Sequence, residues 1–247
     1  MYMGVIGNSP EGEILRELAG TRVLVSGLAR DIGVDVARAF ADVGCRLVVQ
    51  TNDLTPDMTA LVALLSQSAA ELKLYTDPIR SADPAIRFAQ GCQQAFGGLD
   101  TAVNLQTITR EEMRLVSSET DVERLISAKL TPLTHITRVC ANRMRVVFAE
   151  GSILNVLTMP APENAREAAI AGLARTALAA MTRGEAGQWA DQSVRINCIA
   201  PRTGVMAQSG AALKSEPDIA ALALYLASRR GKTLSSHIFD AEMAERS

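Results

Sequence analysis

Aromatic residues, histidine and long apolar runs are scarce in this sequence. Only 4% of the 247 residues are aromatic, and the two histidines, His135 and His237, do not lie at a metal-ligand spacing. No run of about 18 apolar residues is present, so we expect no membrane-spanning helix. The start of the chain lacks the basic flank and apolar segment of a secretory signal, and we therefore expect a cytoplasmic protein.

Cysteine is present but not clustered, and charge of either sign is not in excess. No Cys-x-x-Cys pair occurs, so the cysteines are interpreted as small buried side chains and a metal site is not expected. The formal net charge of −2 gives no electrostatic reason to expect nucleic acid or a membrane surface as a partner. The four cysteines are Cys45, Cys92, Cys140 and Cys198.

Short apolar runs alternate with segments of helical spacing along the whole chain. This alternation predicts one α/β domain over residues 1–247, with residues 1–20 as a lead-in. The expected fold is a Rossmann-like, doubly wound parallel sheet of about seven strands with helices on both faces. Predicted strands are residues 23–25, 47–49, 72–75, 99–104, 152–157, 194–200 and 234–239. Predicted helices are residues 13–18, 32–43, 58–65, 85–96, 121–144, 165–182 and 218–228, with Thr120 and Glu123 as a capping box for the fifth.

The first predicted strand is followed by a glycine-containing turn. Residues 26–33 read Ser-Gly-Leu-Ala-Arg-Asp-Ile-Gly and lead into a predicted helix. In such strand–turn–helix units, backbone N–H groups and the helix N-terminus face a pyrophosphate. The turn resembles the Thr-Gly-x-x-x-Gly-x-Gly segment of the short-chain dehydrogenase/reductase (SDR) family.

The resemblance to the SDR family extends from about Thr21 to Asp240. Residues 99–104 are similar to the strand before the family's Asn-Asn-Ala-Gly, and residues 151–156 to its catalytic-serine strand. Residues 168–175 resemble the helix after its Tyr-x-x-x-Lys motif, and residues 194–201 its Arg-Val-Asn-x-Ile-x-Pro-Gly strand. The resemblance implies the fold of an NAD(P)-dependent oxidoreductase, although a fold alone does not establish activity.

The resemblance also implies a set of cofactor-binding positions. Arg30 is the kind of residue that accompanies NADP in the family, while no acidic residue follows the second strand to bind a ribose hydroxyl, which disfavours NAD. Asp31 replaces the middle glycine; we expect it to cap a helix beginning at Ile32 and to repel a pyrophosphate. Arg202 and Met206 replace a glycine and a threonine near the nicotinamide position. The implied cofactor-binding residues are Ser26, Gly27, Arg30, Ile32, Gly33, Asp77 and Asn104.

The family's reaction centre consists of serine, tyrosine and lysine with a supporting asparagine, and this sequence departs from it. Matching the flanking segments places Thr158 at the serine position, Glu163 at the tyrosine and Glu167 at the lysine. Lys129 stands at the asparagine position. Tyr-x-x-x-Lys occurs nowhere in the chain. Thr158 retains a hydroxyl, whereas neither glutamate can perform its counterpart's role, because a glutamate is anionic at neutral pH.

Two readings of the glutamates remain open. Asn164 and Glu167 follow two prolines in a pattern typical of a helix N-terminus, which favours a capping role for Glu167 over a new acid–base role. Two carboxylates one helical turn apart are also expected to repel each other.

Two connections near the implied site are short. Only four residues separate Thr158 from Glu163, and sixteen separate Pro201 from Asp218. These short connections predict a shallow or open site.

Three functions are consistent with these patterns. The leading hypothesis is an SDR-like protein with a degenerate centre that acts as a non-catalytic subunit or regulator, with an active SDR protein as a candidate partner. The alternatives are an NADP-dependent carbonyl reductase with an unorthodox centre, which would use Thr158 and Glu163, and a small-molecule sensor. The resemblance also implies a homo-oligomer, a dimer or tetramer, formed through residues 165–182 and the long helix before them.

Overall fold

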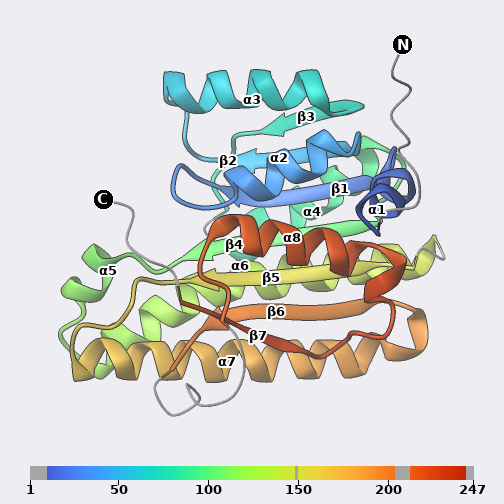
Figure 1. The fold of residues 1–247 in the computed structure, drawn as a ribbon. Coiled ribbons are helices and arrows are strands. Elements are labelled where there is room, and N and C mark those ends of the chain that lie inside the picture. The colour runs from blue at the N-terminus through green and yellow to red at the C-terminus, as the bar shows by residue number, and fades with distance from the viewer. Residues whose placement is uncertain (1–9, 80, 148–149, 204–211, 243–247) are drawn as a thin grey trace.

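Seven parallel strands form one sheet in the order β3-β2-β1-β4-β5-β6-β7 (Figure 1). The computed structural model describes residues 10–79, 81–147, 150–203 and 212–242. The order reverses between β1 and β4, and at such a point the carboxyl ends of parallel strands form a crevice. The strands are β1 (Arg22–Leu28), β2 (Arg46–Thr51), β3 (Glu71–Tyr75), β4 (Thr101–Thr107), β5 (Ser152–Thr158), β6 (Arg195–Pro201) and β7 (Ile238–Ala241).

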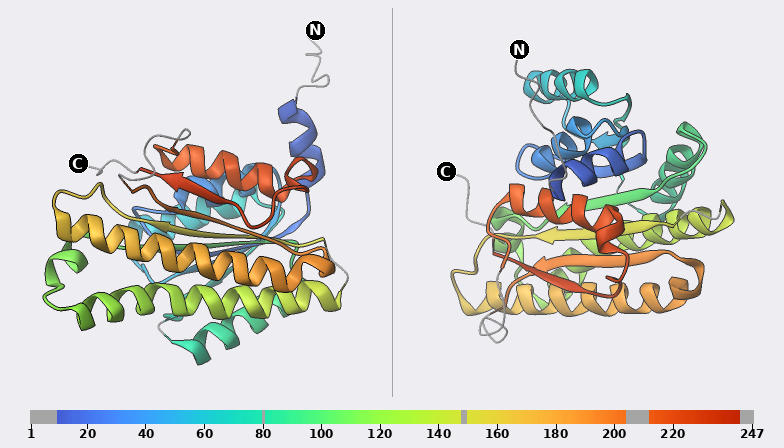
Figure 2. Two further views of the ribbon diagram at one scale, coloured as in Figure 1. Left: turned by 90° about the horizontal axis from the view of Figure 1, so that it is seen from below. Right: turned by 45° about the vertical axis from the view of Figure 1, so that its right-hand side comes forward.

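Helices cover both faces of this sheet, and Figure 2 shows α6 and α7 side by side beneath it. Val23 and Val25 of β1 pack in one core with α1, α2, α3 and α8, whereas Leu24 points to the opposite core with α4 and α6. The period-two alternation of strand side chains therefore separates the two layers. The helices are α1 (Pro10–Leu18), α2 (Val34–Asp42), α3 (Pro56–Ser68), α4 (Ala82–Ala95), α5 (Arg110–Leu115), α6 (Glu119–Val146), α7 (Ala165–Trp189) and α8 (Glu216–Ala227).

The predicted fold class is confirmed, and each predicted strand overlaps a strand of the sheet, although β7 begins at Ile238 and not at residue 234 as predicted. Helix α5 was not predicted, and α7 continues to Trp189 instead of ending near residue 182. The predicted capping box of α6 was wrong by two residues. Ser118 accepts the N–H of Asp121, and the Asp121 side chain accepts the N–H of Ser118. The same chemistry is supplied by a pair two residues earlier, because α6 begins at Glu119 and not near residue 121.

An ion pair joins the start of β1 to the loop before β4. Arg22 Nη2 lies 2.6 Å from Asp100 Oδ1, and the backbone N–H of Arg22 donates to Asp100 Oδ2 over 2.8 Å. Burial acts to raise the pKa of Asp100, but the hydrogen bonds and charge of Arg22 outweigh burial and hold this pKa below its ordinary value. This pair fixes the amino ends of the two strands whose carboxyl ends form the crevice.

The cysteines are buried free thiols, in agreement with their interpretation as core side chains. In the part of the chain that the structure describes, no group of three or more histidine, cysteine or acidic residues could hold a metal ion. No helix within the same ranges is long and apolar enough to cross a membrane.

Candidate functional site

A chain of buried polar side chains crosses the sheet near the crevice between β1 and β4. Ser26 Oγ donates to Asn104 Oδ1, and Asn104 Nδ2 donates to Asn155 Oδ1, each over 2.9 Å. Thr137 of α6 donates to the same Asn155 oxygen over 3.1 Å. Ser26 and Asn104, two of the implied cofactor-binding residues, thus satisfy each other inside the protein.

The glycine-containing turn is closed by its own backbone. Ala29 N–H donates to Ile32 O over 2.9 Å, and Ile32 N–H donates to Ala29 O over 3.3 Å. Two N–H groups of the turn are therefore used inside it. Arg30 extends to the surface, where its NH2 lies 2.5 Å from Asp57 Oδ2, and both side chains are exposed.

The end of β2 also occupies a donor of the turn. Gly27 N–H donates to Gln50 Oε1 over 2.8 Å. The Gln50 amide in turn donates to Asp77 O over 3.1 Å, and the Asp77 residue is exposed. Gln50, which follows the apolar part of the second strand, thereby joins the turn to the loop after β3.

Leu105 of β4 lies against the turn at the switch point. A Cβ on Gly27 would come 2.2 Å from Leu105 O, and one on Gly33 would come 2.3 Å from Leu105 Cδ1 and 3.1 Å from Leu28 Cδ1. Both glycines have positive φ, +78° and +95°. Leu28 and Leu105 are each 1% exposed. These glycines therefore permit close packing between β1, β4 and the turn.

The N-terminus of α2 carries a carboxylate from a distant helix. Glu216, the first residue of α8, accepts the backbone N–H of Asp35 with Oε1 over 2.8 Å, and Glu216 is 1% exposed. Helix α2 begins at Val34 with Gly33 at its N-cap, so the prediction that Asp31 caps a helix from Ile32 was wrong. Asp31 is exposed, because the closed turn directs this residue outward.

These contacts do not fit a pyrophosphate at the N-terminus of α2. A phosphate there is held by free backbone N–H groups and by the positive end of the helix dipole. Here a buried carboxylate accepts one of these N–H groups, and Leu105 fills the space between the two glycines.

The implied serine position lies at the end of the next strand pair. Thr158 and Thr107 are register partners at the carboxyl ends of β5 and β4, and their hydroxyl oxygens are 3.0 Å apart. Thr158 is 6% exposed, and its carbonyl accepts the N–H of Ile108. Its hydroxyl therefore already has a partner within the protein.

One arginine of α5 holds both glutamates of the implied centre. Arg110 NH1 lies 3.1 Å from Glu163 Oε2 and 3.0 Å from Glu167 Oε2. Glu167 Oε2 also accepts the backbone N–H of Glu163, and the backbone N–H of Glu167 donates to Asn164 Oδ1. Glu163 precedes α7, whose N-cap is Asn164, so the capping role of this segment is confirmed. The expected repulsion is offset by the shared cation.

The implied asparagine position is also engaged in an ion pair. Lys129 Nζ lies 2.6 Å from Glu112 Oε1, and Glu112 Oε2 accepts the N–H of Thr109. Sequence reasoning did not find Arg110, Glu112 or Glu216. Thr109 and Glu112 have the S/T-x-x-E spacing of a capping box, which could have predicted α5 and placed Arg110 on it. No local pattern links Glu216 to α2.

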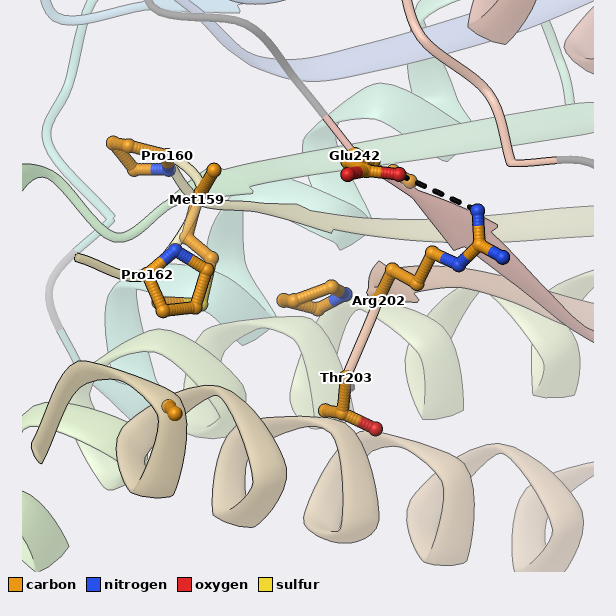
Figure 3. A pocket seen from close by; sticks show the side chains of 10 residues that line it. Met159, Pro160, Pro162, Arg202, Thr203 and Glu242 are labelled. Atoms are coloured by element: carbon orange, nitrogen blue, oxygen red, sulfur yellow. Dashed lines mark hydrogen bonds and ion pairs between the residues drawn. The ribbon is translucent and has the colours of Figure 1, made fainter. Parts of the chain in front are cut away.

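An open pocket of about 560 Å³ lies at the carboxyl ends of β5, β6 and β7. Met159, Pro160 and Pro162 line one side, and Arg202 with Thr203 lines the other (Figure 3). Arg202 Nη1 pairs with Glu242 Oε2 over 3.3 Å, and both residues line the pocket. Ligands in this architecture bind at the carboxyl edge of the sheet, so this pocket is the candidate ligand site. Met206, implied near the nicotinamide, falls outside the described residues.

Comparison with known proteins identifies the family. A family model described as enoyl-(acyl carrier protein) reductase matches residues 27–219. The chain belongs to the SDR family. The 3-oxoacyl-[acyl-carrier-protein] reductase FabG of Chlamydia pneumoniae is 27% identical to this SDR chain, over 86% of the chain and 91% of the relative. Momilactone A synthase of Oryza sativa subsp. japonica is also 27% identical, with 93% and 91% covered.

The fold of this SDR chain agrees with that of solved structures. A short chain dehydrogenase from Mycobacterium avium superposes with a TM-score of 0.73 at 22% identity, covering 92% of this chain and 84% of that one. Members of the family generally bind NAD or NADP and are commonly oligomers. These likenesses establish the SDR oxidoreductase family and the Rossmann-like fold.

Proposed function

We propose that this SDR-family chain is a non-catalytic protein that serves as a subunit or regulator, with an active SDR protein as a candidate partner. The observation that carries the proposal is the contact of Arg110 with both Glu163 and Glu167, at the positions implied for tyrosine and lysine. These two positions form an ion-paired helix cap, which gives them a structural role.

Reduction of a carbonyl by hydride transfer requires a proton donor, which the cluster of Arg110, Glu163 and Glu167 does not offer. Reduction of a carbonyl needs a proton donor near the developing alkoxide, and a positioned acid–base group contributes about 10²–10⁴-fold to the rate. An ionised carboxylate paired with arginine holds no proton to donate. The Thr158 hydroxyl at the implied centre is hydrogen-bonded to the Thr107 hydroxyl, which is not a base that could activate it.

We predict that the purified protein does not catalyse oxidation of NADPH or NADH by carbonyl compounds. The assay follows the absorbance of the reduced nicotinamide with a 3-oxoacyl thioester, a diketone and a cyclic ketone. The Chlamydia pneumoniae relative serves as the positive control under the same conditions. The expected rate equals the rate without protein. Substrate-dependent oxidation that is abolished in Thr158→Ala or Glu163→Gln would contradict the proposal and favour an NADP-dependent reductase with an unorthodox centre.

We propose further that the chain self-associates through the outer face of α6 and α7, as the family resemblance implies. A groove of about 580 Å³ lies between these helices and is lined by Val122, Ile126 and Leu173, among others. Leu173 is 53% exposed and projects into this groove from α7. A groove lined by these apolar side chains and Ala177, together with Glu119, Glu123 and Ser127, supports contact with a second copy of this chain.

We predict that Leu173→Glu shifts the protein toward the monomer. Light scattering after gel filtration should give a multiple of 26.3 kDa for the unchanged chain and a lower mass for the variant. The matched control is Leu64→Glu, because Leu64 is similarly exposed, at 59%, but lies on α3. A monomeric mass for the unchanged chain, or equal effects of the two substitutions, would count against this interface.

A further inference from the structure

The feature that the proposed function leaves unexplained is the buried carboxylate at the N-terminus of α2. Glu216 belongs to α8 and is separated from Asp35 by 181 positions. Its side chain is directed to the amide end of α2, and Glu216 is 1% exposed. An acidic side chain this buried needs compensating contacts, because burial strongly disfavours an isolated charge. The amide end of a helix provides such compensation.

We propose that Glu216 is a built-in anion that occupies the phosphate position of this fold and closes the crevice between β1 and β4 to dinucleotides. The α2 N-terminus normally attracts a phosphate through its free N–H groups and its dipole. Here the Asp35 N–H is taken by Glu216 Oε1 at 2.8 Å. A pyrophosphate would have to displace the carboxylate or accept it as a like-charged neighbour.

Packing around the turn supports the same conclusion. Leu105 Cδ1 lies so close to Gly33 that a Cβ on this glycine would be 2.3 Å away, and Leu28 Cδ1 would be 3.1 Å from the same Cβ. Both leucines are buried in the core shared with α2 and α8. The space beside the helix N-terminus is therefore filled with apolar side chains of the protein.

Donors that would otherwise be directed at a ligand are also used internally. Gly27 N–H donates to Gln50, and the N–H groups of Ala29 and Ile32 donate within the turn. Arg30 is paired with Asp57 at the surface. A dinucleotide would have to break several of these contacts, so the closure does not depend on Glu216 alone.

Cofactor binding at the crevice and proton donation at the reaction centre depend on different residues, so the two properties can be tested separately. A protein with an intact crevice and no proton donor would bind NADPH without turnover, whereas a closed crevice prevents the binding itself. Calorimetric titration separates the two proposals. We expect no heat of binding when millimolar NADPH or NADH is added to the unchanged protein. Saturable binding without turnover would overturn the closed crevice and leave the non-catalytic proposal standing.

The built-in anion itself is tested by replacing it and supplying inorganic phosphate. Glu216→Ala removes the carboxylate and leaves the α2 amides without this acceptor. We expect phosphate, compared with chloride at equal ionic strength, to raise the Tm of Glu216→Ala by about 2–4 °C more than that of the unchanged protein. The gain reflects phosphate binding at the vacated end of α2, since a ligand that binds only the folded state stabilises it.

Ser215→Ala is the matched control. Ser215 is the N-cap of α8, where its hydroxyl accepts the N–H of Asp218. Loss of this hydroxyl weakens α8 but leaves Glu216 in place. Phosphate should therefore change the Tm of Ser215→Ala by as much as it changes the Tm of the unchanged protein. If Glu216→Ala does not fold in chloride, recovery of its far-ultraviolet circular dichroism in phosphate is the equivalent result. Equal responses of the two variants, or no recovery in phosphate, would overturn the assignment of Glu216.

Discussion

Arg110→Ala should destabilise the protein by about 3–5 kcal/mol, because it leaves a buried carboxylate without its cation. The side chains of Arg110 and Glu167 are only 13% and 6% exposed, and their closest atoms are 3.0 Å apart. Removal of the guanidinium would require the Glu167 charge to remain buried or α7 to fray at its start. Urea-induced unfolding at neutral pH, followed by circular dichroism, measures the loss.

Two further variants separate this buried pair from the exposed one. Glu163 also pairs with Arg110, but the Glu163 side chain is 59% exposed. Glu163→Gln should therefore change the free energy of unfolding by less than about 1 kcal/mol. Arg110→Ala combined with Glu167→Gln removes both buried charges and should recover more than half of the loss. If Arg110→Ala costs no more than Glu163→Gln, the arginine does not hold the buried carboxylate.

Gly27→Ala should also be severe and should lower the free energy of unfolding by about 2–5 kcal/mol, because it introduces backbone strain and overpacking. The new Cβ would lie 2.2 Å from Leu105 O, and the residue would keep a φ of +78°. Strand β4 cannot easily move away, since Asn104 pairs with β1 and Leu105 pairs with Val156 of β5. Thermal and urea unfolding both measure the effect.

Gly20→Ala isolates the contribution of the close contact. Gly20 has nearly the same φ, +75°, but no heavy atom lies within 4 Å of its Cβ position. Gly20→Ala should therefore lower the free energy of unfolding by only about 1–2 kcal/mol, which is the cost of holding a residue with a Cβ in the left-handed region. The difference between the two variants measures the approach of β4 to the turn. Similar losses for both would mean that Leu105 moves aside, and the crevice would then be less tightly packed than the structure indicates.

Local sequence patterns were sufficient for the strands and the fold class. Residues 152–157 were predicted as a strand, and all seven residues of β5 are buried. Strand ends were less predictable. β4 continues through Gln106 and Thr107, because these polar residues pair with Leu157 and Thr158 of the neighbouring strand. Such pairing is a property of the sheet and leaves no apolar signal in the segment itself.

Two features of the candidate site were predictable from the sequence. The absence of Tyr-x-x-x-Lys is a statement about sequence, and the match of Asn164 with Glu167 correctly predicted a helix N-terminus. The partners of the glutamates were not predictable, since Arg110 is 57 positions away from Glu167 and lies on a helix that periodicity missed. Short-range patterns describe a helix end but not the charge that a distant helix brings to it.

The sequence by itself determined the alternating α/β architecture, the glycines of the first turn and the absence of Tyr-x-x-x-Lys. Only the tertiary structure decided which groups surround Glu163, Glu167 and the first turn. It joined Arg110 to both glutamates and brought Glu216 across 181 positions to the amide of Asp35. The physical reason is that hydrophobic periodicity is local, whereas the compensation of a buried charge depends on which distant groups the fold places beside it.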